Sequence, residues 1–204
     1  MKNNHKRGIT LVVCCLVSFS QVALAQSTYL ISDSKSNDIK LSGTSSLHDW
    51  DMNAHAFTGK AEFDFKKDDD QILVGLNSLT FSLPVINLKS DKKGLDKNAY
   101  EVLHTGKYKN IVYTLLTAKV TPQKDNKFLV KATGNLTIAG VTKETEMDVH
   151  CVVNANGTIT CTGSDKLNMT DYNVKPPTFM LGAMKTGDGI TLEFNVVYKT
   201  QKGA

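Results

Sequence analysis

Arginine is almost absent from this sequence, and its absence limits what the protein can bind. Arg7 is the only arginine among 204 residues. The rest of the chain therefore lacks the planar guanidinium group that grips phosphates and guanine edges with two parallel hydrogen bonds. We expect no nucleic acid partner.

The sequence also lacks the common catalytic motifs. It contains no Cys-x-x-Cys pair, no Gly-x-Ser-x-Gly elbow and no glycine-rich phosphate loop. His48 and Asp49 are adjacent, but neighbouring residues on a strand point to opposite faces, so they cannot form the orienting hydrogen bond of a catalytic triad. His48 and His55 have no third metal ligand at a suitable spacing. We expect no catalytic residues and no metal site, so the protein is predicted not to be an enzyme.

No apolar run is long enough to span a bilayer, which takes about 20 residues. The apolar stretch from Ile9 to about Phe19 follows a basic start and precedes Ala23-Leu24-Ala25, which fits the small-x-small cleavage rule. This arrangement predicts a signal peptide at residues 1–25 and a single exported domain at residues 26–204. A membrane anchor is the alternative for this segment. Lipidation at Cys14 is a second alternative, disfavoured by the bulky Val13 before it.

Removal of residues 1–25 would also change the charge. The whole chain has 24 basic and 20 acidic residues, and three of the basic ones, Lys2, Lys6 and Arg7, lie in the segment to be removed. The mature chain would keep 21 basic residues against 20 acidic ones, a charge near +1. We expect a periplasmic location and no stable membrane insertion after cleavage.

Two cysteines remain in the predicted mature chain, Cys151 and Cys161. An even number in an oxidising compartment favours a disulfide. Ala155-Asn156-Gly157 suits a three-residue hairpin loop with glycine in the left-handed conformation, and this loop places Cys151 opposite Cys161. Directly opposed Cβ atoms lie about 4.5 to 5.5 Å apart, wider than the about 3.8 Å of a disulfide, so a non-hydrogen-bonded pair with added twist is required. Two free buried thiols are the alternative.

Apolar and polar residues alternate with a period of two along six segments, which is the pattern of strands with one dry face. The inward positions would be Trp50, Met52, Ala54 and Ala56; Ala61, Phe63 and Phe65; Leu79, Phe81, Leu83 and Val85; Ile111, Tyr113 and Leu115; Thr145, Met147, Val149, Cys151 and Val153; and Ile190, Leu192, Phe194, Val196 and Tyr198. Turn-forming clusters at residues 67–70, 122–126 and 139–140 separate some of these segments. The pattern predicts an antiparallel sheet that is closed or folded on itself.

One segment has helical spacing instead. Leu95, Ala99, Val102 and Leu103 follow the i, i+4, i+7, i+8 rule, with Gly94 before them and Gly106 after them. A helix of about ten residues is not stable alone. We therefore expect it to cap one mouth of a barrel.

Four stretches in this order resemble the YceI-like family: residues 42–50, 94–103, 134–143 and 167–177. The resemblance implies a mainly β fold, an extended eight-stranded antiparallel lipocalin-like barrel with one short helix. It also implies a long apolar chain inside, such as a polyisoprenoid, an isoprenoid quinone-like molecule, or a fatty acid or its amide. Leu47-His48-Asp49-Trp50 departs from the usual opening of the family, and the Cys151 and Cys161 pair is not a general family feature.

The resemblance implies an apolar interior that binds an amphiphilic lipid, and the mixture of inward residues is compatible with it. Large residues such as Phe63 and Phe194 mix with the small Ala54, Ala56 and Ala61, which would leave room for a groove. The residues predicted to bind lipid are Trp50, Met52, Ala54, Phe63, Phe81, Leu83, Tyr113, Met147, Phe179, Met180 and Phe194.

The region of His48, Asp49 and Trp50 either shapes the barrel mouth or forms a turn whose side chains satisfy local backbone groups. No cofactor is expected apart from the lipid, and the protein is expected to be a monomer or a homodimer. The alternative function is a non-enzymatic stress-related or interaction protein with a filled barrel.

Overall fold

The structure is a computed structural model that describes residues 27–179 and 184–201. The predicted signal peptide and Met180 lie outside these ranges. The chain forms eleven described strands and one α-helix, α1, in elements with the following bounds: β1 Ser27–Ile31, β2 Asp38–Ser45, β3 Trp50–Ala54, β4 Thr58–Lys66, β5 Asp69–Pro84, α1 Lys93–Val102, β6 Asn110–Pro122, β7 Lys127–Ile138, β8 Val141–Val153, β9 Ile159–Asn168, β10 Thr178–Phe179 and β11 Met184–Thr200. Two short 3-10 helices, η1 (Val85–Asn87) and η2 (Met169–Tyr172), follow β5 and β9.

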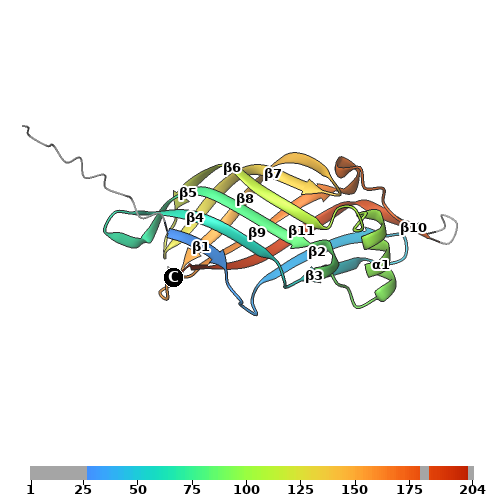
Figure 1. The fold of residues 1–204 in the computed structure, drawn as a ribbon, viewed down its shortest axis with the longest axis horizontal. Coiled ribbons are helices and arrows are strands. Elements are labelled where there is room, and N and C mark those ends of the chain that lie inside the picture. Colours follow the sequence, from blue (N-terminus) through green and yellow to red (C-terminus); the bar gives the residue numbers. More distant parts are fainter. Residues whose placement is uncertain (1–26, 180–183, 202–204) are drawn as a thin grey trace, which may run out of the picture.

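The strands form one antiparallel sheet that closes into an eight-strand ring, as predicted. The order around the ring is β1-β4-β5-β6-β7-β8-β9-β11, and β11 pairs again with β1 through Tyr198 and Ile31. β2 continues the line of β1 along β11, and β3 pairs with β2. Backbone hydrogen bonds between Asn53 and Lys89 tie β3 to the segment after η1. The ring is therefore an elongated, barrel-like shell (Figure 1).

Two neighbouring strand pairs are joined over only part of their length. Within the described part of the chain, β8 pairs with β9 only over Val149–Val153, next to the hairpin that joins them. β5 pairs with β6 only over Thr80–Pro84. The sheet therefore departs from a regular barrel, because the strands of each of these two pairs are hydrogen-bonded at one end only.

The predicted turns are confirmed, and positive φ angles explain their composition. Ala139 (φ 48°) and Gly140 (φ 81°) form the two-residue turn between β7 and β8, where both positions need the left-handed region. Gly157 (φ 78°) ends the three-residue loop between β8 and β9. Its register brings Cys151 opposite Cys161.

The period-two alternation is confirmed along β3, β4, β8 and β11. One expected inward position is wrong: Ala56 is exposed, because β3 ends at Ala54 and the chain turns before β4. Phe57 packs inward instead, with its ring centre 5.3 Å from that of Phe81.

Aromatic side chains fill the end of the shell where β1, β4 and β11 meet. Phe63 contacts Tyr29 and Tyr198 edge to face, with ring centres 5.3 and 5.6 Å apart. Ala61 is fully buried there. This end of the shell therefore has a packed aromatic core.

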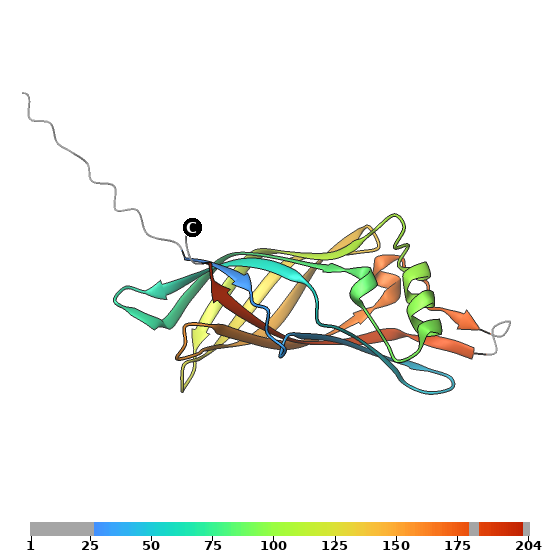
Figure 2. The same ribbon diagram turned by 60° about the horizontal axis from the view of Figure 1, so that its bottom comes forward.

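α1 lies across the other end of the shell, far from the start of β1, in both ribbon views (Figures 1 and 2). The Tyr100 hydroxyl anchors it, 2.7 Å from the carbonyl oxygen of Leu88. The left-handed residue that ends the helix is His104 (φ 51°), whereas Gly106 was expected to mark this point. The capping position of the helix is confirmed.

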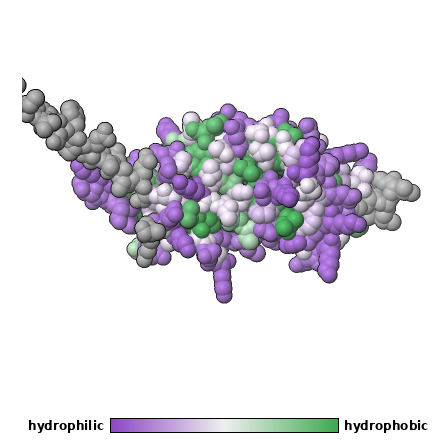
Figure 3. Space-filling view, in the orientation of Figure 1, coloured by the Kyte–Doolittle hydropathy of each residue, from purple (hydrophilic) through white to green (hydrophobic). Residues whose placement is uncertain are grey.

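The outer surface is mostly polar. Figure 3 shows one face of the molecule, where the apolar side chains form small groups among polar ones. Among the described residues, the large apolar side chains that are exposed are Leu47, Val74, Ile86 and Leu116. The main apolar surface of the molecule lies inside the shell.

Candidate functional site

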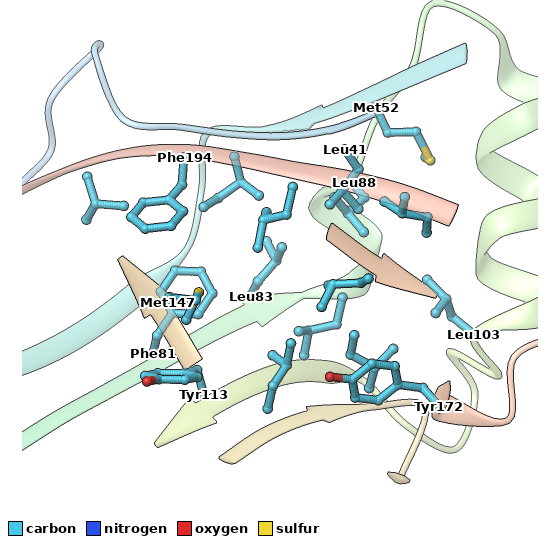
Figure 4. Close-up of a pocket in the computed structure, with 18 of the residues that line it drawn as sticks. Leu41, Met52, Phe81, Leu83, Leu88, Leu103, Tyr113, Met147, Tyr172 and Phe194 are labelled. Carbon is cyan, nitrogen blue, oxygen red and sulfur yellow. The ribbon is translucent and has the colours of Figure 1, made fainter. Parts of the chain in front are cut away.

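An apolar cavity with a volume of about 240 Å³ lies inside the shell. Side chains of both walls point into it: Figure 4 shows Leu41 and Met52 on one side and Tyr113 and Tyr172 on the other. An apolar cavity of about 150 Å³ is already large enough to stay dry and bind benzene. This cavity can therefore hold part of a slender apolar chain.

The structure places most of the predicted lipid-binding residues on the cavity wall. These residues are Trp50, Met52, Phe63, Phe81, Leu83, Tyr113, Met147 and Phe194. Ala54 is buried but does not line the cavity, and the small Ala61 lies in the packed end. The expectation that these alanines make the room is therefore wrong. Met180 and the side chain of Phe179 lie outside the part of the chain described.

α1 forms the end wall of the cavity. Leu95, Ala99, Val102 and Leu103, the residues with helical spacing, all line it. None of the helix residues is fully buried, because the helix covers a hollow instead of a packed core. The amphipathic face of α1 therefore acts as a lid over the apolar space.

Other lining residues were not predicted. Val130, Ala132 and Leu136 come from β7, where inward residues alternate as in the other strands, so the signal was present in the sequence. Tyr172 and Val174 come from η2 and the segment after it. Those two follow no regular period, so only the fold shows where they point.

Trp50 forms part of the wall and is held in place by its surroundings. Its indole N–H donates to the carbonyl oxygen of Thr44 at 3.1 Å. The ring lies flat over Gly43, where a Cβ atom would come 2.3 Å from the indole carbon Cζ2. Glycine is thus required at position 43 for this placement of the indole.

A polar groove of about 330 Å³ adjoins the cavity, and Trp50 and Leu95 line both. The other lining residues are polar, and include His48, Lys89 and Lys92. His48 Nδ1 lies 2.9 Å from the carbonyl oxygen of Asp49, and its Nε2 lies 3.2 Å from Lys92 Nζ. The segment of His48, Asp49 and Trp50 therefore satisfies local backbone groups and also borders the site.

Cys151 and Cys161 lie on the cavity wall and are buried. Asn154 N–H donates to the carbonyl oxygen of Thr158, so these two residues form a hydrogen-bonded pair. Hydrogen-bonded and non-hydrogen-bonded pairs alternate along an antiparallel ladder, so Cys151 and Cys161 form a non-hydrogen-bonded pair, as a disulfide requires. Their sulfur atoms are 3.0 Å apart, as thiols. The hydrogen bond with Cys151 and burial raise the pKa of Cys161. The register is confirmed, while the covalent bond stays a prediction.

Among the described residues, no three histidine, cysteine or acidic side chains are grouped so that they could hold a metal ion. The same part of the chain contains no helix that is long and apolar enough to cross a membrane.

A family model for the YceI-like domain matches residues 32–198. No curated protein matches the sequence. The fold is similar to that of BcnA from Burkholderia cenocepacia, with a TM-score of 0.62 and 16% identity over 82% of this chain and 98% of that one.

Two further solved structures share the fold. A polyisoprenoid binding domain from Saccharophagus degradans has a TM-score of 0.63 and 9% identity, over 86% of this chain and 99% of that one. The YceI protein of Campylobacter jejuni has a TM-score of 0.52 and 20% identity, over 71% and 82%. At these identities the likeness concerns the fold alone.

Proposed function

Because the chain belongs to the YceI-like family, we propose that it is a periplasmic binding protein that carries a long-chain amphiphilic lipid. The lipid would be a polyisoprenoid, an isoprenoid quinone-like molecule, or a fatty acid or its amide. The polyisoprenoid binding domain of similar fold supports this class of ligand. The observation that carries the proposal is the apolar cavity beneath α1.

The composition of the cavity wall supports a chain as the ligand. Its lining residues are almost all aliphatic, aromatic or methionine side chains. Burial of apolar area contributes about 25 cal/mol per Å², so an extended chain gains affinity with each methylene that enters. The Met52 and Met147 thioethers can adapt to chains of different shape.

The polar groove gives the head group a place outside the apolar space. It meets the cavity at Trp50 and Leu95, so a molecule with an apolar tail and a polar end could occupy both. Lys89, Lys92 and three aspartates lie along the groove, which offers both hydrogen-bond donors and acceptors.

The proposal assigns no catalytic step to the protein. His48 is within hydrogen-bond distance of a backbone oxygen and of Lys92 Nζ, and neither partner is a hydroxyl or thiol that it could activate or a carboxylate that could orient it. The second candidate is a non-enzymatic interaction protein with a filled interior, for which the packed aromatic end of the shell is the supporting observation.

Native mass spectrometry of the protein purified without detergent from its own host tests the proposal, followed by lipid analysis of a denaturing extract. We expect a stoichiometric long-chain species, and a chain that begins at Gln26 in a periplasmic fraction. A bare polypeptide that also takes up no added prenyl or fatty acyl chain would favour the filled interior instead. A chain that begins at Met1 in the cytoplasm would refute the export part alone.

A further inference from the structure

Tyr113 lines the cavity, and its hydroxyl is buried in the wall without a hydrogen-bond partner among the residues the structure describes. The residue as a whole is 6% exposed. Buried hydroxyls almost always have a partner, because an unpaired one loses its hydrogen bonds to water and gains none. The isolated hydroxyl therefore requires an explanation.

The backbone holds the Tyr113 side chain in this position. On β6, Tyr113 lies between Phe81 of β5 and Leu136 of β7. Its ring covers Gly134, where a Cβ atom would come 2.4 Å from the hydroxyl oxygen. The glycine makes room for the phenol to lie along the wall, and Figure 4 shows the ring at the cavity close to Phe81 and Met147.

The surroundings offer no good substitute for a partner. A buried water needs two to four polar groups to hold it, whereas Phe81, Leu136 and Met147 around the phenol are apolar. Burial raises the pKa of Tyr113 to about 12, so the hydroxyl keeps its proton and remains a donor at neutral pH. Met147, which packs in the same cluster, is flexible enough to move aside for a ligand.

We propose that Tyr113 determines specificity by donating a hydrogen bond to an oxygen atom within the apolar chain of the ligand. The cavity then prefers a long chain that carries a carbonyl or ether oxygen away from its polar end over a plain hydrocarbon chain. This inference rests on the proposed function, because it requires that a long chain enters the cavity.

A matched pair of neutral probes tests it. Heptadecane and 9-heptadecanone have the same chain length, and only the ketone has an oxygen acceptor in mid-chain. Binding of each is measured by displacement of a fluorescent fatty acyl probe from the ligand-free protein. The ratio of the two affinities is compared between the natural protein and Tyr113→Phe, so that the different solubilities of the probes in water cancel.

We expect the preference for the ketone to fall about tenfold in Tyr113→Phe, which corresponds to about 1.4 kcal/mol, while heptadecane binding is retained. Tyr29→Phe is the control: it also removes the hydroxyl of a buried tyrosine, but Tyr29 lies in the packed end and does not line the cavity. Its ratio should stay unchanged.

The two proposals fail in different ways. If both probes bind and the ratio is the same in Tyr113→Phe, the role of Tyr113 is refuted and the lipid-binding function stands. If neither probe binds to the folded natural protein, both proposals fall. A reduced ratio in Tyr29→Phe as well would show a general effect of removing a buried hydroxyl and would overturn the assignment to Tyr113.

Discussion

The stability of an Ala132→Phe variant would distinguish a hollow interior from a filled one. Ala132 lies on β7, is 6% exposed and lines the cavity. Its cross-strand neighbours are Ala118 on β6 and Met147 on β8. A phenyl ring added at this point would lie between the small Ala118 and the flexible Met147, and it would enter the cavity.

The sign of the stability change is the informative quantity. Full burial of a phenylalanine side chain is worth about 1.5 to 3 kcal/mol, so in a hollow interior the ligand-free variant should gain about 1 to 2 kcal/mol relative to alanine. In a filled interior the same ring overpacks the core and costs about 1 to 3 kcal/mol. For a domain of this size the gain would raise the melting temperature by about 2 to 8 °C.

The same ring should reduce lipid binding. If it displaces three methylenes of the ligand, at about 0.8 kcal/mol each, the loss is about 2.4 kcal/mol, or about 50-fold in affinity. Denaturant unfolding of delipidated protein and displacement of a fluorescent fatty acyl probe measure the two effects. Thr133→Phe is the control, because Thr133 is the next residue, on the outer face, and should change stability by no more than about 0.5 kcal/mol. Lower stability of Ala132→Phe, or unchanged binding, would refute the reasoning.

Three further predictions follow from single contacts. Burial raises the pKa of Tyr113 from 10.0 to about 12, so its contribution to stability is present below pH 10 and lost as the pH rises toward 12. The free energy of unfolding of Tyr113→Phe, measured by urea titration between pH 10 and 12, should therefore fall by up to about 2.7 kcal/mol less than that of the natural protein. An equal fall in both proteins would contradict this. Cys151 and Cys161 should form a disulfide in the exported protein, lowering its mass by two hydrogens and adding about 2 to 3 kcal/mol of stability that reductant removes; a reduced mass would refute it. Gly134→Ala should cost about 1 to 3 kcal/mol in denaturant unfolding by displacing the Tyr113 ring, whereas Gly189→Ala, with open space around the added Cβ, should cost less; equal losses would show a general effect of removing a strand glycine.

The sequence was sufficient to predict six of the strands and the helix, because each of these elements carries a local pattern. Alternation along β8 and β11 specifies which side chains point inward, and the loop at residues 155–157 specifies the register of Cys151 and Cys161. The spacing of Leu95, Ala99 and Leu103 specifies one face of α1. These features depend on residues that are close in the sequence.

The position of the hollow could not be predicted in the same way. Ala54 and Ala61 are small and buried, yet neither lines the cavity. Tyr172 reaches the cavity from a 3-10 turn with no periodic pattern. Whether an inward residue meets a partner or a space depends on what lies opposite it across the shell, and only the closed ring determines that.

The hollow end also has an energetic consequence for the whole domain. An unfilled cavity costs about 24 cal/mol per Å³, so a volume of about 240 Å³ corresponds to about 6 kcal/mol. Natural domains are stable by only about 5 to 15 kcal/mol in total. The packed aromatic end, around Phe63 and Tyr198, must therefore supply much of the stability of the ligand-free chain. A bound chain that fills the cavity recovers part of the cost, so the ligand becomes part of the core, and its binding and the stability of the fold cannot vary independently.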